Sequence, residues 1–388
     1  MTIARTGWIV AVCAAFLCTA VPTGSRAADP YEINAILSVT GQASFLGKEE
    51  AQALGVIEDM VNKAGGVAGR PVKFVVADDQ SNPQIAVQLA NVVIAKKAPV
   101  VIGPSLSGTC SATAPLLTSG PVELCLSPGI HPPEGSYVFS TNASTVDLAI
   151  ITARYLRTRG VKKVAFIFST DASGQDGEQA VNGVFSAPDN QGVTIVTREH
   201  FNVNDVSVAA QIAHIKASGA EVLYVWASGT PVATVLRGAS DAGLSLPVIT
   251  SVSNATYAQM KAYESFMPKE LLFVSAPDLA PGELPNGRVK QAVGVFRNAF
   301  KAIGVQAEHG HALAWDAGLI VIDALRKFGT NVGAGQLREY LQNLRWQGIS
   351  GAYDFRAIPQ RGLNYSSLMV TRWDPAKGAW VGVSKLGG

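Results

Sequence analysis

Residues 100–115 read VVIGPSLSGTCSATAP, and this stretch decides the fold and marks the place where a binding site is expected. The apolar run from Val100 to Ile102 predicts a buried strand, and the Gly/Pro/Ser turn after it leads into a helix. Such a turn brings backbone N–H groups, hydroxyls and the positive end of a helix dipole to one spot, which suits a carboxylate or another anion. An ordinary strand-to-helix turn with a Ser or Thr cap explains the same residues.

The first 27 residues have the pattern of a secretory signal peptide. Arg5 supplies the positive charge, the run from Gly7 to Val21 is apolar and uncharged, and Ser25-Arg26-Ala27 provides small residues for cleavage. No later segment offers ~20 consecutive apolar residues, the length that a membrane span needs. We therefore expect an exported soluble protein that is cleaved near Ala27.

The composition is that of a neutral, tightly turned α/β protein, with 48% hydrophobic residues and 38 glycines. Arg5 and Arg26 lie in the signal segment, which leaves 29 basic against 29 acidic residues. This balance gives no reason to favour nucleic acid or an anionic membrane as a partner. Outside the signal segment, Cys110 and Cys125 form either a disulfide or two buried thiols, because the sequence does not give their separation.

Strand and helix patterns alternate in two successive arrays. The first predicts strands at 33–37, 72–77 and 100–102, with helices at 47–64 and after Asn82. The second predicts strands at 164–168, 193–196, 222–226 and 246–250, with helices at 177–185, 206–217 and 232–242. Further helices are expected at 287–303 and 311–328, and a β-rich tail at 352–355, 367–373 and 380–383. Two βαβ arrays in about 360 residues predict two doubly wound lobes with parallel sheets.

The motifs of common enzyme and metal sites are absent from the sequence. It contains no phosphate loop, no His-Glu-x-x-His or Cys-x-x-Cys pair and no Gly-x-Ser-x-Gly elbow. His309 and His311 stand two positions apart without an evident third ligand, so they are expected to be surface or helix-start histidines. Asp78 and Asp79 fit a turn cap. We expect no catalytic residues, no metal and no cofactor.

Six short motifs occur in a characteristic order along the chain. They are Leu37–Gly41 with Gly47, Ala64–Val67 with Gly69–Val72, Asp78–Pro83, Ile102–Pro104 with Ser107-Gly108, Ser127-Pro128 and Trp315–Ala317. In this order they resemble the type I periplasmic binding proteins of branched-chain (hydrophobic) amino acid ABC importers, over essentially the whole chain after the signal. The resemblance implies two Rossmann-like lobes joined by a three-crossover hinge near Thr141, Ala276 and Gly351. Lobe 1 would comprise 28–141 plus 277–348, and lobe 2 142–276 plus 349–388.

The resemblance also implies a function. A protein of this kind captures a small molecule between its lobes by hinge closure, and the closed form then meets an ABC permease in the inner membrane. We therefore expect a periplasmic, monomeric, non-enzymatic binding protein that contacts no nucleic acid.

Several residues match ligand-binding positions of the family. Ser107, Gly108 and Thr109 match the turn that holds the ligand carboxylate, and Gly129, Ile130 and His131 match the backbone segment across from it. Phe45 and Leu46 fall where the family has an aromatic lid. His131 fits an exposed loop residue equally well, and Phe45 a loop anchor. Candidates in the second lobe are Ser173, Trp226, Gly229, Thr230, Ser253 and Asn254, and Trp315 is a further candidate lining group.

One family feature is missing. Amino-acid binders place an acid after the fourth strand of the second lobe to pair with the ligand ammonium, whereas this chain reads Thr250-Ser251-Val252-Ser253-Asn254. A buried ammonium without a carboxylate partner is costly. Asp171 is a substitute partner or, alternatively, a turn cap. We expect a hydrophobic or aromatic carboxylic acid as the ligand, with a branched-chain or other hydrophobic amino acid, or a ligand-sensing role for the same clamp, as alternatives.

Overall fold

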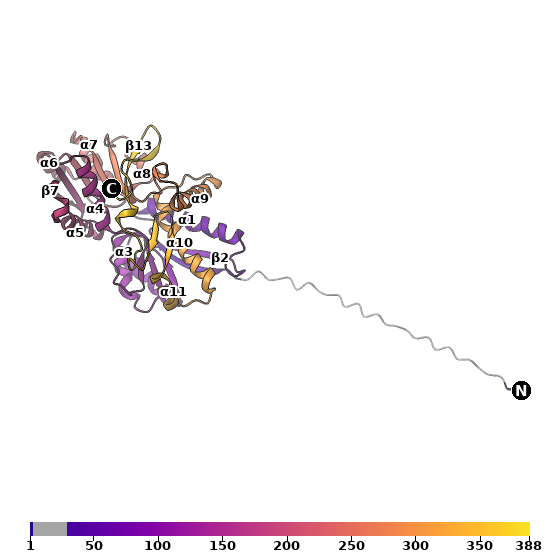
Figure 1. Ribbon diagram of the computed structural model, residues 1–388. Coiled ribbons are helices and arrows are strands. Elements are labelled where there is room, and N and C mark those ends of the chain that lie inside the picture. Colours follow the sequence, from indigo (N-terminus) through magenta and orange to yellow (C-terminus); the bar gives the residue numbers. More distant parts are fainter. Residues whose placement is uncertain (3–28) are drawn as a thin grey trace.

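The computed structural model describes residues 1–2 and 29–388, so the expected signal segment lies, apart from its first two residues, outside the described part. The chain forms two lobes, each built on a sheet with helices packed against it (Figure 1). This arrangement confirms the predicted α/β class with two parallel-sheet lobes. Within residues 29–388, no helix combines the length and apolar character that a membrane span requires.

The first lobe contains a five-stranded parallel sheet in the order β2-β1-β3-β4-β5. Its strands are β1 (Tyr31–Leu37), β2 (Val72–Asp78), β3 (Val100–Ile102), β4 (Val122–Cys125) and β5 (Val138–Ser140). Its helices are α1 (Ser44–Lys63), α2 (Pro83–Ala95), α3 (Ser107–Thr113), α9 (Arg288–Ala302), α10 (His309–Phe328) and α11 (Ala334–Gln342). Helix α2 begins as its sequence predicts, because Asn82 caps it and accepts a hydrogen bond from the Gln84 N–H at 2.8 Å.

The second lobe contains a seven-stranded sheet in the order β14-β13-β10-β9-β8-β6-β7, in which only β13 and β14 run antiparallel to their neighbours. Its strands are β6 (Lys163–Ser169), β7 (Thr194–Phe201), β8 (Val222–Trp226), β9 (Val248–Ser251), β10 (Leu271–Ser275), β13 (Met369–Asp374) and β14 (Ala379–Gly382). Its helices are α4 (Thr145–Thr158), α5 (Ala172–Ser186), α6 (Ala209–Ala217), α7 (Pro231–Asp241) and α8 (Tyr257–Tyr263). The sequence patterns did not single out β4, β5, β10, α4, α8 or α11.

The third crossover between the lobes lies further along the chain than the expected position near Gly351. Strand β12 (Ala352–Asp354) pairs with β11 (Arg345–Gln347) and not with the tail strands of the second lobe. The Gln360 carbonyl accepts a hydrogen bond from Ser140 of β5 at 2.8 Å, which holds this segment on the first lobe. The chain reaches the second lobe at Tyr365, whose N–H donates to Asp147 at 2.9 Å. Residues 352–361 therefore pack with lobe 1, not with lobe 2 as expected.

Trp315 is a core residue of the first lobe and does not line the cavity described below. Its side chain is 2% exposed, and its ring meets Phe296 edge-on with centroids 5.2 Å apart. Phe300 packs on the same ring at 5.8 Å. The expectation of a ligand contact at Trp315 is therefore not met, because the aromatic side chain faces α9.

Glu123 on β4 gives the first lobe a pH-dependent stability. The carboxyl is fully buried; its Oε2 accepts the Thr113 hydroxyl at 2.7 Å and its Oε1 has no partner in the described residues. Burial raises the pKa of Glu123 from 4.5 to about 8. A carboxyl with a raised pKa stabilises the fold fully below its unfolded value, and this contribution is lost as the pH rises through the folded value.

We therefore expect Glu123→Gln to be more stable than the wild-type protein at about pH 9 and to lose less stability from about pH 5 to about pH 8. The difference should approach ~1.4 kcal/mol per pH unit over that window. Urea unfolding at several pH values measures it, with Glu134→Gln on an exposed loop as the matched control. Equal slopes for the two variants would contradict the expectation.

Candidate functional site

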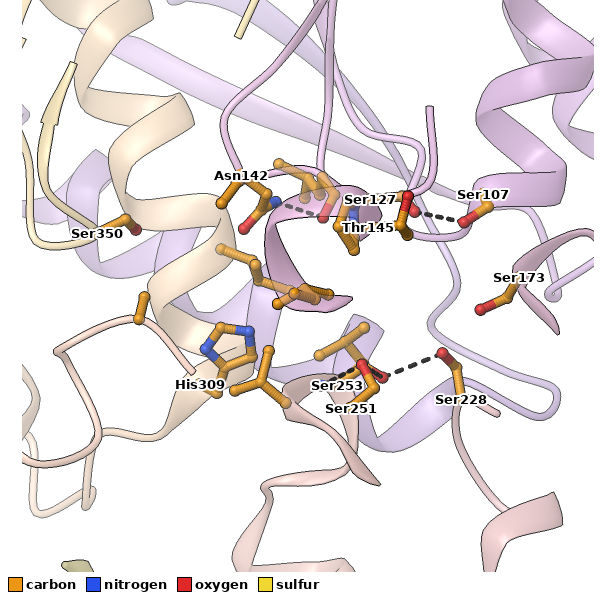
Figure 2. Close-up of a pocket in the computed structure, with 18 of the residues that line it drawn as sticks. Ser107, Ser127, Asn142, Thr145, Ser173, Ser228, Ser251, Ser253, His309 and Ser350 are labelled. Atoms are coloured by element: carbon orange, nitrogen blue, oxygen red, sulfur yellow. Dashed lines mark hydrogen bonds between the residues drawn. The ribbon is translucent and has the colours of Figure 1, made fainter. Parts of the chain in front are cut away.

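A cavity of about 800 Å³, including its opening to solvent, lies between the two lobes. Its walls are the turns that follow β3, β4 and β5 in the first lobe and β6, β8 and β9 in the second, together with the start of α10 (Figure 2). These turns stand at the carboxyl ends of parallel strands, where ligands bind in open α/β sheets. The topology therefore places the cavity where a ligand site is expected.

The cavity wall is largely apolar. Its apolar residues are Leu46, Leu106, Leu126, Pro128, Ala143, Leu148, Trp226, Val252, Ala276, Leu313, Leu363 and Leu368. The Trp226 ring is held from behind, because it stacks on Tyr224 with centroids 5.0 Å apart. Such a wall suits the apolar body of a small ligand.

The polar groups of the wall are mostly hydroxyls. They belong to Ser105, Ser107, Ser127, Asn142, Thr145, Ser173, Ser228, Ser251, Ser253, His309, Ser350 and Ser367. Among the described residues, no Asp, Glu, Lys or Arg lines the cavity. The site therefore offers hydrogen bonds without a carboxylate, and His309 is the one basic side chain among the described residues of its wall.

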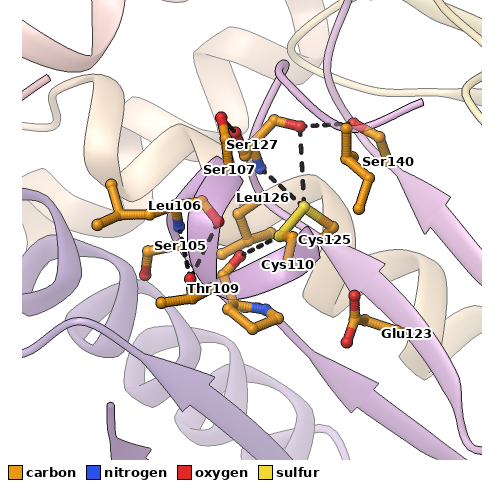
Figure 3. Close-up of a disulfide and its surroundings, with 12 residues drawn as sticks. Ser105, Leu106, Ser107, Thr109, Cys110, Glu123, Cys125, Leu126, Ser127 and Ser140 are labelled. Atoms are coloured by element: carbon orange, nitrogen blue, oxygen red, sulfur yellow. Dashed lines mark hydrogen bonds between the residues drawn. A yellow bond between two sulfur atoms is a disulfide. The ribbon is translucent and has the colours of Figure 1, made fainter. Parts of the chain in front are cut away.

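The turn after β3, within residues 100–115, forms one end of the cavity. The hydroxyls of Ser107 and Ser127 lie 2.7 Å apart, and the Gly129 N–H donates to Ser127 at 3.2 Å. Cys110 and Cys125 form a disulfide with Cα atoms 6.1 Å apart, which joins the turn after β3 to the end of β4 beside these serines (Figure 3). The two turns thus form one covalently linked unit.

Not all first-lobe candidates reach the cavity. Leu46 and Ser107 line it, whereas Phe45 and Gly108 do not. The Thr109 hydroxyl instead donates to the Leu106 carbonyl at 3.0 Å and so belongs to the turn itself. Thr109 therefore does not line the cavity, contrary to its predicted role as a ligand contact.

The segment from Gly129 to His131, which was expected to line the carboxylate site, does not contact the cavity. Ile130 packs into the apolar cluster around the disulfide, and Gly129 lies behind Ser107. His131 contacts Asp176 of α5, with Nε2 and Oδ1 2.6 Å apart, so it links the two lobes outside the cavity. None of these three residues lines the cavity wall.

In the second lobe, Ser173, Trp226 and Ser253 line the cavity, whereas Gly229, Thr230 and Asn254 do not. Asn254 is fully buried and accepts the Gly229 N–H at 2.8 Å, so its amide fixes the turn after β8. The Thr230 N–H donates to the Gln42 carbonyl of the first lobe at 3.3 Å. Gly229 and Thr230 therefore form a contact between the lobes.

The turn after β6 contains an acid that does not face the cavity. Asp171 caps α5, and its Oδ1 accepts the Gly174 N–H at 3.1 Å and the Ser169 hydroxyl at 2.7 Å. Both bonds hold the carboxylate against its own helix. The structure therefore favours the turn cap over the ammonium partner as the role of Asp171.

A buried group of Glu49, Glu308 and His311 brings three ligand-type side chains within 4.8 Å of one another. Both nitrogens of His311 are engaged, Nδ1 with the Glu308 N–H at 3.1 Å and Nε2 with Gln52 at 2.8 Å. Burial, and after it the neighbouring Glu308 carboxylate, raise the pKa of Glu49 to about 11. The two carboxyls thus share a proton, and the group does not fit a metal ion.

The sequence patterns missed Asn142, Ser228, Ser251, His309 and Ser350 as lining residues. Asn142 and Ser228 follow β5 and β8, and Ser251 is the last residue of β9, so their positions at strand ends were the available signal. His309 and His311 lie in the first turn of α10, which agrees with the helix-start alternative. Both are buried, so the surface alternative is wrong.

Together, the fold and the site define a two-lobed α/β receptor with a small-molecule cavity between its lobes. The chain belongs to the periplasmic binding protein family, whose model matches residues 30–379. It is 25% identical over 355 residues to "Leu/Ile/Val-binding protein homolog 3" of Brucella melitensis, which covers 89% of this chain and 92% of that protein. It is also 27% identical over 226 residues to the "Leucine-, isoleucine-, valine-, threonine-, and alanine-binding protein" of Pseudomonas aeruginosa, a match that covers 57% of this chain and 60% of that protein.

Solved structures share the fold. An extracellular ligand-binding receptor from Rhodopseudomonas palustris matches with a TM-score of 0.80 at 20% identity, covering 92% of this chain and 100% of that one. LivJ of Streptococcus pneumoniae, solved with isoleucine, has a TM-score of 0.74 at 18% identity and covers 92% and 100%. A solute-binding protein of R. palustris, solved with benzoate, has a TM-score of 0.75 at 18% identity and covers 92% and 96%.

Proposed function

We propose that this protein is the periplasmic receptor of an ABC importer for a small apolar or aromatic carboxylic acid without an amino group. Hinge closure of the two lobes captures the ligand. The observation that carries the proposal is the cavity wall, which combines an apolar lining with hydroxyls and, among the described residues, contains no acidic side chain.

Among the described residues, the wall offers hydroxyls but no carboxylate to pair with an ammonium group. An amino acid buried in this cavity would lose the hydration of its ammonium without gaining a carboxylate in return. Asp171 is held by its own helix, and Asp176 is paired with His131 outside the cavity. A ligand without an amino group avoids this cost.

Hydroxyl groups are suitable donors for a carboxylate. Ser107 and Ser127 of the first lobe and Ser173 of the second lie on the same side of the cavity in Figure 2. Hydrogen bonds to a charged group contribute about 1.5–3 kcal/mol each. We therefore assign the ligand carboxylate to this side, with its apolar body against Leu148 and Trp226.

Thermal unfolding with a ligand panel tests the proposal. Benzoate at about 100 times its Kd should stabilise the protein by about 2.7 kcal/mol, because it binds only the folded state. Leucine, isoleucine and the uncharged benzamide should leave the melting temperature unchanged. Stabilisation by leucine with no effect of any acid would overturn the proposal in favour of a branched-chain amino acid receptor, which the relatives' names favour.

Ser107→Ala tests where the carboxylate binds. Loss of one hydrogen bond to a charged group should weaken benzoate binding about 10- to 100-fold in calorimetry. Ser111→Ala is the matched control, because Ser111 lies on the same helix and is exposed. Equal affinities for the two variants would remove Ser107 from the site.

A further inference from the structure

His309 lies at the other end of the cavity. It is the first residue of α10, its side chain lines the cavity and it is 3% exposed. Figure 2 shows the ring on the side away from Ser107 and Ser173. A ligand whose carboxylate binds the serines would therefore turn its opposite end toward this imidazole.

Asp278 stands behind the imidazole. The carboxylate lies on the segment that follows β10, is 2% exposed, and its Oδ2 is 3.5 Å from His309 Nδ1. Within residues 29–388, neither carboxylate oxygen of Asp278 nor His309 Nδ1 has a hydrogen bond, and His309 is the only cationic side chain within 4 Å of the carboxylate oxygens. The Arg297 guanidinium donates instead to the backbone carbonyl of Asp278 at 2.7 Å. A buried carboxylate without a donor is costly, so Asp278 draws the Nδ1 hydrogen toward itself.

This pairing sets the role of the second ring nitrogen. With Nδ1 turned to Asp278, Nε2 is the nitrogen left for the cavity, as a donor or an acceptor according to the charge of the ring. A hydroxyl both donates and accepts, so it can pair with Nε2 in either state. A methyl group or a bare ring edge leaves Nε2 unpaired inside an apolar wall.

We infer that His309, oriented by Asp278, selects carboxylic acids that carry a hydroxyl at the end opposite the carboxylate. The inference rests on the proposed function and narrows its ligand to hydroxylated aromatic acids. His309 is then a ligand contact and Asp278 a positioning residue. A site built to hydrogen-bond a hydroxyl discriminates strongly against an analogue that lacks it.

Calorimetry with three probes tests the inference: 4-hydroxybenzoate, the similarly sized 4-methylbenzoate and benzoate. The wild-type protein should bind 4-hydroxybenzoate at least tenfold more tightly than 4-methylbenzoate. His309→Leu should bring this ratio to about one, and His309→Gln, which keeps a polar group near the position of Nε2, should restore part of it. His200→Gln is the matched control, because His200 is an exposed histidine that pairs with Glu178.

A second measurement begins with the wild-type protein, so its main result does not depend on the folding of a variant. The sequence has five histidines, so imidazole nitrogen-15 spectra can follow each ring. 4-Hydroxybenzoate should shift the His309 signal more than 4-methylbenzoate does, and Asp278→Asn should reduce that difference. Binding of benzoate with no preference for the hydroxyl overturns this inference and leaves the proposed function standing. Binding of none of the three acids overturns both.

Discussion

Gly177→Ala should weaken benzoate binding by at least about 100-fold. The added methyl group displaces Trp226 or α5, and the ligand then loses its contacts with one wall of the cavity. A Cβ atom at Gly177 would lie 2.1 Å from both Nε1 and Cε2 of Trp226. The indole cannot retreat, because it is 2% exposed and stacks on Tyr224. Either the ring enters the cavity or α5 moves away and carries Ser173 with it. Both movements remove ligand contacts.

The same helix provides the control for this substitution. A Cβ at Gly183 meets no atom within 4 Å, so Gly183→Ala should keep the wild-type affinity and gain slightly in stability. The double variant Gly177→Ala with Trp226→Leu frees the space of the indole and should recover part of the loss. Calorimetry and tryptophan fluorescence measure both effects. An affinity of Gly177→Ala within threefold of the wild type would show that the wall tolerates the shift.

Asp316→Ala should lower the free energy of unfolding by about 2–6 kcal/mol, because each buried donor left without its acceptor costs about 1–3 kcal/mol. Asp316 is 1% exposed and accepts hydrogen bonds at 3.0 Å from the N–H groups of Ile349 and Ser350 and from the Tyr353 hydroxyl. Without the carboxylate, the N–H groups of Ile349 and Ser350 stay buried and unpaired, and the Tyr353 hydroxyl keeps only the Thr141 carbonyl as its acceptor. The segment that carries Ser350 into the cavity would lose its anchor on α10.

Urea unfolding measures this loss of stability. Asp316→Asn keeps one oxygen acceptor and should fall between the wild-type protein and the alanine variant. Asp241→Ala, at an exposed position near the end of α7, should change stability by no more than about 0.5 kcal/mol. A loss for Asp316→Ala no larger than that of Asp241→Ala would mean that solvent reaches the freed N–H groups.

Local patterns predicted most of the alternating elements, because strands such as β6 and β8 are apolar runs followed by turn residues. Strand β10 has the same pattern and was nevertheless missed. Strand β5 has only three residues and β4 contains Glu123, so neither carries a recognisable period. The position of β12 depends on its partner β11, and strand pairing is not visible in a three-residue segment. For this reason the third crossover was placed too early.

The sequence predicted which turns reach the cavity, but not which side chains of those turns face it. Ser107, Ser173 and Ser253 follow strands and do face the cavity. Asn254 stands next to Ser253 and faces the other way, because its amide binds the neighbouring turn. Tertiary hydrogen bonds decide such orientations. His309 was missed for a related reason, since nothing in its local sequence shows that α10 begins inside the cleft.

The disulfide between Cys110 and Cys125 makes the receptor unequal in its two halves. It links the serine turns of the first lobe covalently, whereas the second lobe contains no cysteine and holds its side of the cavity by hydrogen bonds and side-chain packing. New ligand preferences are therefore easier to introduce through Ser228 and Ser253, where a substitution leaves the stapled half intact. The first lobe can therefore stay unchanged while the cavity residues of the second lobe are varied.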